Sequence, residues 1–100
     1  MLVMIRSFAN VGTEDIYDGR NSIDARRLLP RNVWKIAFRK LDQLDAAVSL
    51  DDMRVPPSNR LELLKADRAG QHSIRINDQY RICFVWSDMN AVNVEIVDYH

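Results

Sequence analysis

The last thirty residues of the chain alternate apolar and polar side chains in three runs, which short turns separate. Residues 71–76, 80–86 and 91–98 read as strands, because alternation with a period of two places one set of side chains on each face of a sheet. The links at 77–79 and 87–90 are rich in Asn, Asp and Ser, which favour turns. Links this short favour antiparallel pairing of neighbours. The sequence therefore predicts an antiparallel meander.

Helical periodicity precedes these strands. Residues 30–48 carry an apolar stripe at steps of three or four residues, which is typical of one buried helix face, and Pro30 suits its first turn. Thr13, followed by two acids, predicts the N-cap of a short helix that ends before Gly19. The stripe is Val33, Ala37, Leu41, Leu44 and Val48, widened by Trp34 and Phe38.

Two shorter runs complete the expected elements. Ile5–Phe8 alternates and reads as a short strand, and Leu61–Lys65 is a candidate first strand of the meander. Val55–Asn59 contains two prolines, which break regular structure between the long helix and the sheet. Helices followed by an antiparallel sheet define the α+β class. We expect a single domain over residues 1–100, with the long helix on one face of the sheet.

Composition excludes several classes of protein. No apolar run approaches the roughly 20 residues of a membrane span. Cys83 is the only cysteine, so no intrachain disulfide forms and it is expected to pack as a small core residue. One cysteine with His72 and His100 predicts no metal site. The N-terminal apolar run is too short for a signal peptide, which favours a cytoplasmic protein, and either Met1 or Met4 is the start.

Charge is unevenly distributed although the formal net charge is zero. Residues 54–86 carry six basic and three acidic side chains, a net charge of +3, whereas residues 87–100 carry −3. The basic stretch has two interpretations, which are solvated strand edges or a surface that faces phosphate groups. The pattern alone leaves both open.

Three proton-active side chains form a tail where the last predicted strand ends. They are the carboxylate of Asp98, the phenol of Tyr99 and the imidazole of His100. Arg81 is equally informative, because it lies on an otherwise apolar strand and arginine is seldom buried without a partner. It either pairs with an acid such as Asp78 or Asp98 or faces a cleft. The tail is therefore a candidate catalytic cluster.

Other candidates have ordinary interpretations when each is taken alone. Lys65 ends its predicted strand beside a small polar turn and reads as a solvated lysine. His72 is expected to make a structural hydrogen bond, since buried polar groups are normally bonded. Tyr99 alone would more often pack its ring than react. Residue type alone therefore assigns none of these three a function.

A resemblance to a known family favours a functional role for these residues. The stretch Pro57–Phe84, the ending Val94–His100 and the opening Ile5–Phe8 together resemble HigB-type toxins of the RelE/ParE superfamily of bacterial toxin–antitoxin systems. The resemblance implies a small antiparallel sheet with N-terminal helices, in agreement with the elements expected above. It also implies a ribosome-dependent endoribonuclease, which enters the ribosomal A site and cuts messenger RNA.

The resemblance also implies individual site residues. Glu62 stands where some relatives have a histidine and Gln79 where some have an asparagine. Both are further candidates, and these departures could weaken toxicity. The positions that match the catalytic residues of the family are Lys65, Arg81, Asp98, Tyr99 and His100.

The implied chemistry needs no metal or cofactor, because RNA carries its own nucleophile, the 2′-OH. Lys65 and Arg81 would supply cations around the phosphate, with Arg81 able to bind two of its oxygens. Either Tyr99 or His100 would activate the hydroxyl, and Tyr99, with a reference pKa of about 10, needs nearby cations to do so. Asp98 would orient Arg81 or His100.

The resemblance implies two partners, a ribosome with its message and a cognate HigA-like helix-turn-helix antitoxin. Operator DNA would be bound only through the antitoxin, and no membrane would be bound. The alternatives are a ParE-like gyrase inhibitor and a non-catalytic interaction module, neither of which needs the proton-active cluster. Basic side chains are expected to dock on ribosomal RNA phosphates through salt-dependent contacts. These docking candidates are Arg39, Lys40, Arg54, Arg60, Arg68 and Arg75.

Overall fold

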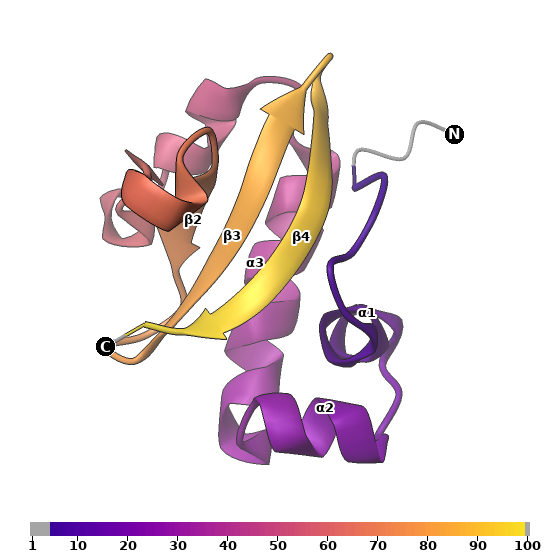
Figure 1. Cartoon of the computed structure of the whole chain (residues 1–100). Coiled ribbons are helices and arrows are strands. Elements are labelled where there is room, and N and C mark those ends of the chain that lie inside the picture. Colours follow the sequence, from indigo (N-terminus) through magenta and orange to yellow (C-terminus); the bar gives the residue numbers. More distant parts are fainter. Residues whose placement is uncertain (1–4, 100) are drawn as a thin grey trace.

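The computed structural model describes residues 5–99. Within this range, three α-helices come first and a four-stranded sheet follows, with short 3-10 turns between them (Figure 1). The α+β class is therefore confirmed. The helices are α1 Val11–Asp18, α2 Ile23–Leu28 and α3 Trp34–Ala46; the strands are β1 Glu62–Leu63, β2 His72–Arg75, β3 Tyr80–Ser87 and β4 Asn90–Asp98; the 3-10 turns are η1 Arg31–Val33, η2 Leu50–Arg54, η3 Pro57–Asn59 and η4 Ala66–Arg68.

The sheet is an antiparallel meander in the order β1-β2-β3-β4, as predicted. Ile82 in β3 pairs with Ile74 on β2 and with Ile96 on β4, so an apolar row crosses the sheet. β1 is shorter than the predicted strand at 61–65, because only Glu62 and Leu63 pair with β2.

The N-terminal segment lies along the outer edge of β4. Ile5 and Phe8 form isolated parallel bridges to β4, with Ala91 and Val94 respectively, in place of the regular strand that alternation predicted. The N–H of Ala9 donates to the carbonyl of Val94 at 2.9 Å. This edge of the sheet is therefore partly covered. The choice of start between Met1 and Met4 lies outside the described residues.

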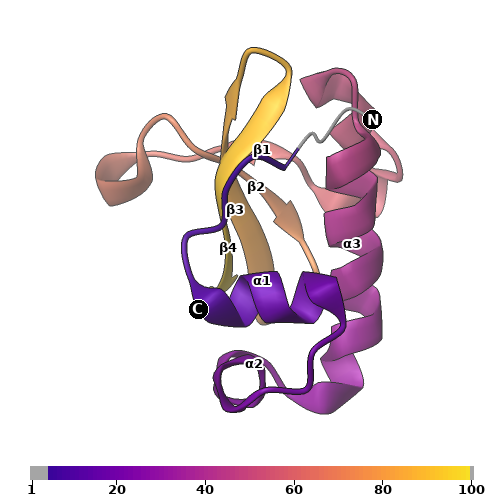
Figure 2. The same ribbon diagram turned by 90° about the vertical axis from the view of Figure 1, so that its right-hand side faces the viewer.

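The helices cover one face of the sheet. Figure 2 shows the sheet close to edge-on, with α3 along one face and α1 and α2 near one end. Leu41 and Leu44 of α3 belong to the same buried cluster as Ile74, Ile82 and Phe84 of the sheet, and all five are fully buried. Burying a side chain of this size contributes about 1.5–3 kcal/mol, so this layer supplies much of the driving force for folding.

The stripe predicted for the long helix is wrong at its last position. α3 ends at Ala46, because Ala47 already has an extended backbone. Val48 therefore leaves the helical period and is 57% exposed. Its N–H and that of Ser49 donate to the Asp52 carboxylate, which turns the chain into η2. The other stripe positions are confirmed as buried: Val33, Ala37, Leu41 and Leu44.

The first helix begins earlier than predicted. Asn10, not Thr13, is its N-cap, since the Asn10 side-chain oxygen accepts from the Thr13 N–H at 2.9 Å. Thr13 is instead fully buried, and its hydroxyl accepts from the Ile96 N–H of β4 at 3.0 Å. Gly19 ends α1 with a φ of 77°, as expected. α2 was not predicted, because six residues are too few to show a helical period.

The sheet face opposite α3 is more polar. Cys83 is fully buried there, opposite Ser73 on β2 and Glu95 on β4. The thiol is free and buried as predicted, but it lies outside the aliphatic core. Burial raises the pKa of the Cys83 thiol. Among residues 5–99, no helix combines the length and apolar character needed to cross a membrane, and no cluster of His, Cys, Asp and Glu could hold a metal ion.

Candidate active site

The tail is anchored at the start of β3. The N–H of Tyr99 donates to the carbonyl of Gln79 at 2.7 Å, and the Gln79 side-chain amide donates to Asp98 Oδ2 at 3.1 Å. Asp98 also pairs with Tyr80 at the end of the β3–β4 ladder. These contacts fix Tyr99 beside the turn that precedes β3. His100 lies outside the described residues.

Arg81 is held at three points on the polar sheet face. Its Nε donates to Ser73 Oγ at 2.8 Å, and its Nη2 donates to the Arg60 carbonyl at 2.7 Å. The same Nη2 lies 3.3 Å from Glu62 Oε1, which completes an ion pair. Arg81 is only 8% exposed, so this buried charge has the bonded partners that burial requires.

The acid that pairs with Arg81 differs from the two predicted ones. Asp78 instead pairs with Arg75, the last residue of β2, three residues earlier in the chain. Asp98 accepts from the Gln79 amide. The acid on Arg81 is Glu62, whose strand lies two places away in the sheet, and the role of Asp98 in orienting Arg81 or His100 stays a prediction.

Tyr99 packs its ring on Arg81. The guanidinium carbon lies 5.5 Å from the ring centroid, within the range of a cation–π contact. Tyr99 remains 46% exposed, so the guanidinium occupies one side of the ring while much of the side chain reaches solvent. The structure thus brings together two of the predicted catalytic residues from different elements.

An open hollow adjoins this pair. Its volume is about 290 Å³, and it is bounded by η4, the end of the β1 segment and the tail. Lys65 lies exposed on its rim, and its ammonium has no ion-pair partner among residues 5–99. Lys65 and Tyr99 therefore share one cavity. The lining residues are Leu64, Lys65, Ala66, Asp67, Arg68 and Tyr99.

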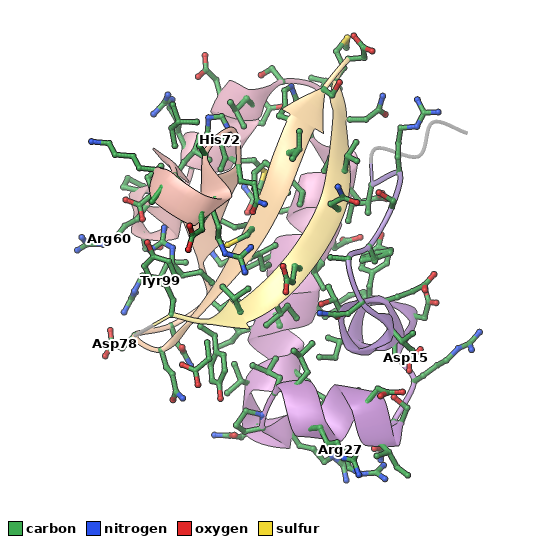
Figure 3. The ribbon with its side chains drawn as sticks, in the orientation of Figure 1. Asp15, Arg27, Arg60, His72, Asp78 and Tyr99 are labelled. Carbon is green, nitrogen blue, oxygen red and sulfur yellow. The ribbon has the colours of Figure 1, made fainter. Side chains whose placement is uncertain are left out.

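A larger hollow lies elsewhere, between α1 and α2. Its volume is about 370 Å³, and Asp24 and Arg27 lie on its wall. The predicted catalytic residues do not line it. Figure 3 shows Arg27 and Asp15 at the helical end of the molecule, well away from Tyr99. Chemistry, not size, therefore selects the smaller hollow as the candidate active site.

Most predicted docking residues already have partners. Arg68 pairs with Glu95 at 3.2 Å, and Lys40 donates to the side chain of the buried Asn59. Burial lowers the pKa of Lys40. Arg54 and Arg75 pair with Asp51 and Asp78, whereas the side chains of Arg39 and Arg60 have no ion-pair partner among residues 5–99.

The hydrogen bond expected for His72 is wrong. Its Nδ1 is buried without a hydrogen-bond partner among the residues that the structure describes. The imidazole instead stacks on Phe84, with ring centroids 6.2 Å apart. Burial, and secondarily the charge of Arg54, lowers the pKa of His72. His72 lies farther along the sheet than Tyr99 and Arg60, as Figure 3 shows, so it takes no part in the site.

Two groups at the site were not predicted from the sequence. Ser73 is fully buried, and its hydroxyl is an acceptor for Arg81. The only sequence signal was its position on the polar face of an alternating run. The carbonyl of Arg60 carries no sequence signal at all, because a left-handed backbone conformation, with φ 46°, places it there.

Comparison with known proteins identifies the family. A family model described as the RelE-like toxin of the type II toxin–antitoxin system HigB matches residues 6–100. The chain belongs to this HigB-like toxin family. Toxin HigB-1 of Vibrio cholerae is 48% identical over 67 residues, which span 67% of this chain and 70% of that toxin. An uncharacterised protein of Haemophilus influenzae is 39% identical over 77 residues, spanning 77% of this chain and 75% of its own.

A solved structure supports the fold of this HigB-like toxin. The YoeB–YefM complex from Staphylococcus aureus contains a chain that superposes with a TM-score of 0.59, covering 96% of this chain and 97% of that one. The sequence identity is 17%, so this likeness establishes the RelE-like fold and nothing about chemistry. The resemblance to HigB-type toxins is confirmed by the family match.

Proposed function

We propose that this HigB-like toxin is a ribosome-dependent endoribonuclease, which cuts messenger RNA in the ribosomal A site by attack of the 2′-OH on the adjacent phosphorus. The observation that carries the proposal is the contact of the Tyr99 ring with the Arg81 guanidinium, at 5.5 Å, beside the cavity that Lys65 shares. A proton-active phenol thus contacts one cation, Arg81, and shares an open hollow with a second, Lys65. RNA supplies the nucleophile, which DNA lacks.

Arg81 and Lys65 serve as the cations of the proposed site. The Arg81 fork is held by Ser73 and Arg60, so it is oriented before substrate arrives. Donors that are oriented in advance stabilise charge that develops in the transition state without reorganising. Lys65 is exposed on the rim, where its flexible side chain and single ammonium charge suit a second phosphate oxygen.

The tail carries out proton transfer in the proposed reaction. Either Tyr99 or His100 removes the proton of the 2′-OH, and a proton donor is needed for the leaving 5′-oxygen. Asp98 and Gln79 contribute by holding the tail at the start of β3.

The ribosome supplies the substrate and part of its geometry. Bending the message aligns the 2′-OH with the phosphorus. Such alignment lowers the activation free energy by up to about 7–11 kcal/mol. Arg39 and Arg60 are the docking candidates whose side chains lack ion-pair partners among residues 5–99. The other docking candidates would have to exchange an acid or an amide for an rRNA phosphate.

The proposed partner is a HigA-like helix-turn-helix antitoxin. The family match is to a type II toxin–antitoxin toxin, and the similar fold from S. aureus comes from a YoeB–YefM complex. Operator DNA is expected to be bound through the antitoxin only, as the resemblance to HigB-type toxins implies. The proposed compartment is the cytoplasm, where translating ribosomes are found.

The proposal is tested by controlled expression followed by mapping of 5′ ends on cellular transcripts. New ends within translated codons are expected from the wild type, and fewer from Lys65→Gln, which removes a cation but not the fold. Asp88→Asn, in the distant β3–β4 turn, is the matched surface control. Growth arrest with intact messages and a DNA-damage response would overturn the nuclease in favour of a gyrase inhibitor, and no effect would favour an interaction module.

A further inference from the structure

The N–H donors of Arg81 differ in whether they have an acceptor and in how short the contact is. A guanidinium has five N–H donors in a planar fork. The Nε donor and one Nη2 donor are bonded to Ser73 and to the Arg60 carbonyl, at 2.8 and 2.7 Å. The contact from Nη2 to Glu62 is longer, at 3.3 Å. No described residue accepts from Nη1. Glu62 is therefore the weakest of the three partners that hold Arg81.

Glu62 is also the partner that can move. Its side chain is 50% exposed, whereas that of Arg81 is 10% exposed. Glu62 lies on β1, a strand of two residues at the edge of the sheet. Solvent reaches the Glu62 side of the ion pair and screens it, so the pair contributes little free energy. The carboxylate can swing into water while Ser73 and Arg60 keep the guanidinium in place.

A carboxylate and a phosphate present the same kind of acceptor to a guanidinium, namely anionic oxygen. We propose that Glu62 holds the phosphate position on Arg81 in the free toxin, and that the RNA phosphate displaces its carboxylate on binding. This inference rests on the proposed function. Glu62 is then a positioning and competing residue and takes no proton from the 2′-OH.

Displacement predicts an effect on binding more than on turnover. The fraction of toxin with Arg81 free for phosphate limits the apparent affinity. Glu62→Gln keeps the side-chain shape but removes the competing charge. We expect it to lower Kd for RNA about threefold to fivefold, which corresponds to the free energy of a weak, solvent-screened ion pair. KM should fall by the same factor, with kcat nearly unchanged.

The experiment uses the full chain and ribosomes programmed with a short message whose scissile nucleotide is 2′-deoxy, so that binding is measured without cleavage. Asp88→Asn is the matched control, since it also removes one negative charge, lies at the other end of β3 and suits the positive φ of 50° there. We expect Glu62→Gln to bind more tightly than wild type, and Asp88→Asn to bind like wild type. Thermal melting checks that both variants are folded.

The outcomes separate the two proposals. If wild type cuts the unmodified message and Glu62→Gln binds no more tightly than Asp88→Asn, the role of Glu62 is overturned while the nuclease stands. A lower kcat for Glu62→Gln at unchanged Kd also overturns it, in favour of a proton-transfer role. If wild type does not cut the unmodified message on programmed ribosomes, the proposed nuclease function is overturned, whatever the deoxy message binds.

Discussion

The hydroxyl of Ser73 lies 2.8 Å from Nε of Arg81, on the polar face of the sheet. Ser73 is fully buried and Arg81 is 8% exposed. The two residues come from neighbouring strands and are offset by two residues in the register, since Ser73 pairs with Cys83 and Arg75 with Arg81. This bond connects the stability of the sheet to the orientation of a proposed catalytic cation.

Ser73→Ala tests that connection. The substitution leaves the Arg81 Nε–H without its acceptor in a buried setting, which costs about 1–3 kcal/mol. We expect a lower urea midpoint and slower cleavage per folded molecule, because the guanidinium loses one of its fixed points. Ser58→Ala, at an exposed position of η3, is the control and should keep both properties. A Ser73→Ala protein as stable and as active as wild type would show that the bond contributes nothing.

Thr13→Val separates stability from activity. The Thr13 hydroxyl accepts from the buried Ile96 N–H at 3.0 Å, and valine has nearly the same shape without the acceptor. We expect about 1–3 kcal/mol less free energy of unfolding, with cleavage per folded molecule unchanged, because Thr13 does not line the active-site hollow. Thr13→Ser keeps the hydroxyl and should lose less. Equal loss in both variants would assign the effect to packing instead.

His72 predicts a pH dependence of stability. Its folded pKa lies below the ordinary value of 6.5, chiefly through burial. The unfolded chain therefore takes up the proton first as the pH falls, so this contribution to stability is complete above 6.5 and is lost as the pH falls through the lowered folded pKa. His72→Phe keeps a ring against Phe84 and should show a flatter profile. Urea midpoints measured across this range check it, and parallel profiles for the two proteins would refute it.

The long helix and the strands of the meander could be predicted from the sequence for a physical reason. Alternation over residues 71–98 and the stripe from Val33 to Leu44 each repeat often enough to define a buried face. α2 escaped because it is too short to repeat, and Val48 was misplaced because the capping by Asp52 ends the helical period before it.

The site was readable only as a set of residue types. The tail and Arg81 were candidates from the residue pattern, and the resemblance added Lys65. In the structure Tyr99 contacts Arg81 and shares a hollow with Lys65. The acid on Arg81 was not predictable, because Glu62 reaches it across an intervening strand. The Arg60 carbonyl depends on a left-handed turn, which no side-chain pattern records. Contacts between elements, unlike elements themselves, need the register of the sheet.

The most direct measurement is the rate of single-turnover cleavage of a message on programmed ribosomes by Tyr99→Phe and His100→Gln. Tyr99→Phe keeps the ring on Arg81 and removes only the hydroxyl, so its thermal stability should match that of wild type. We expect at least one of the two variants to be slower by about 10²–10⁴-fold, the loss expected for a general acid or base. Wild-type rates in both would contradict it and remove the tail from the chemistry.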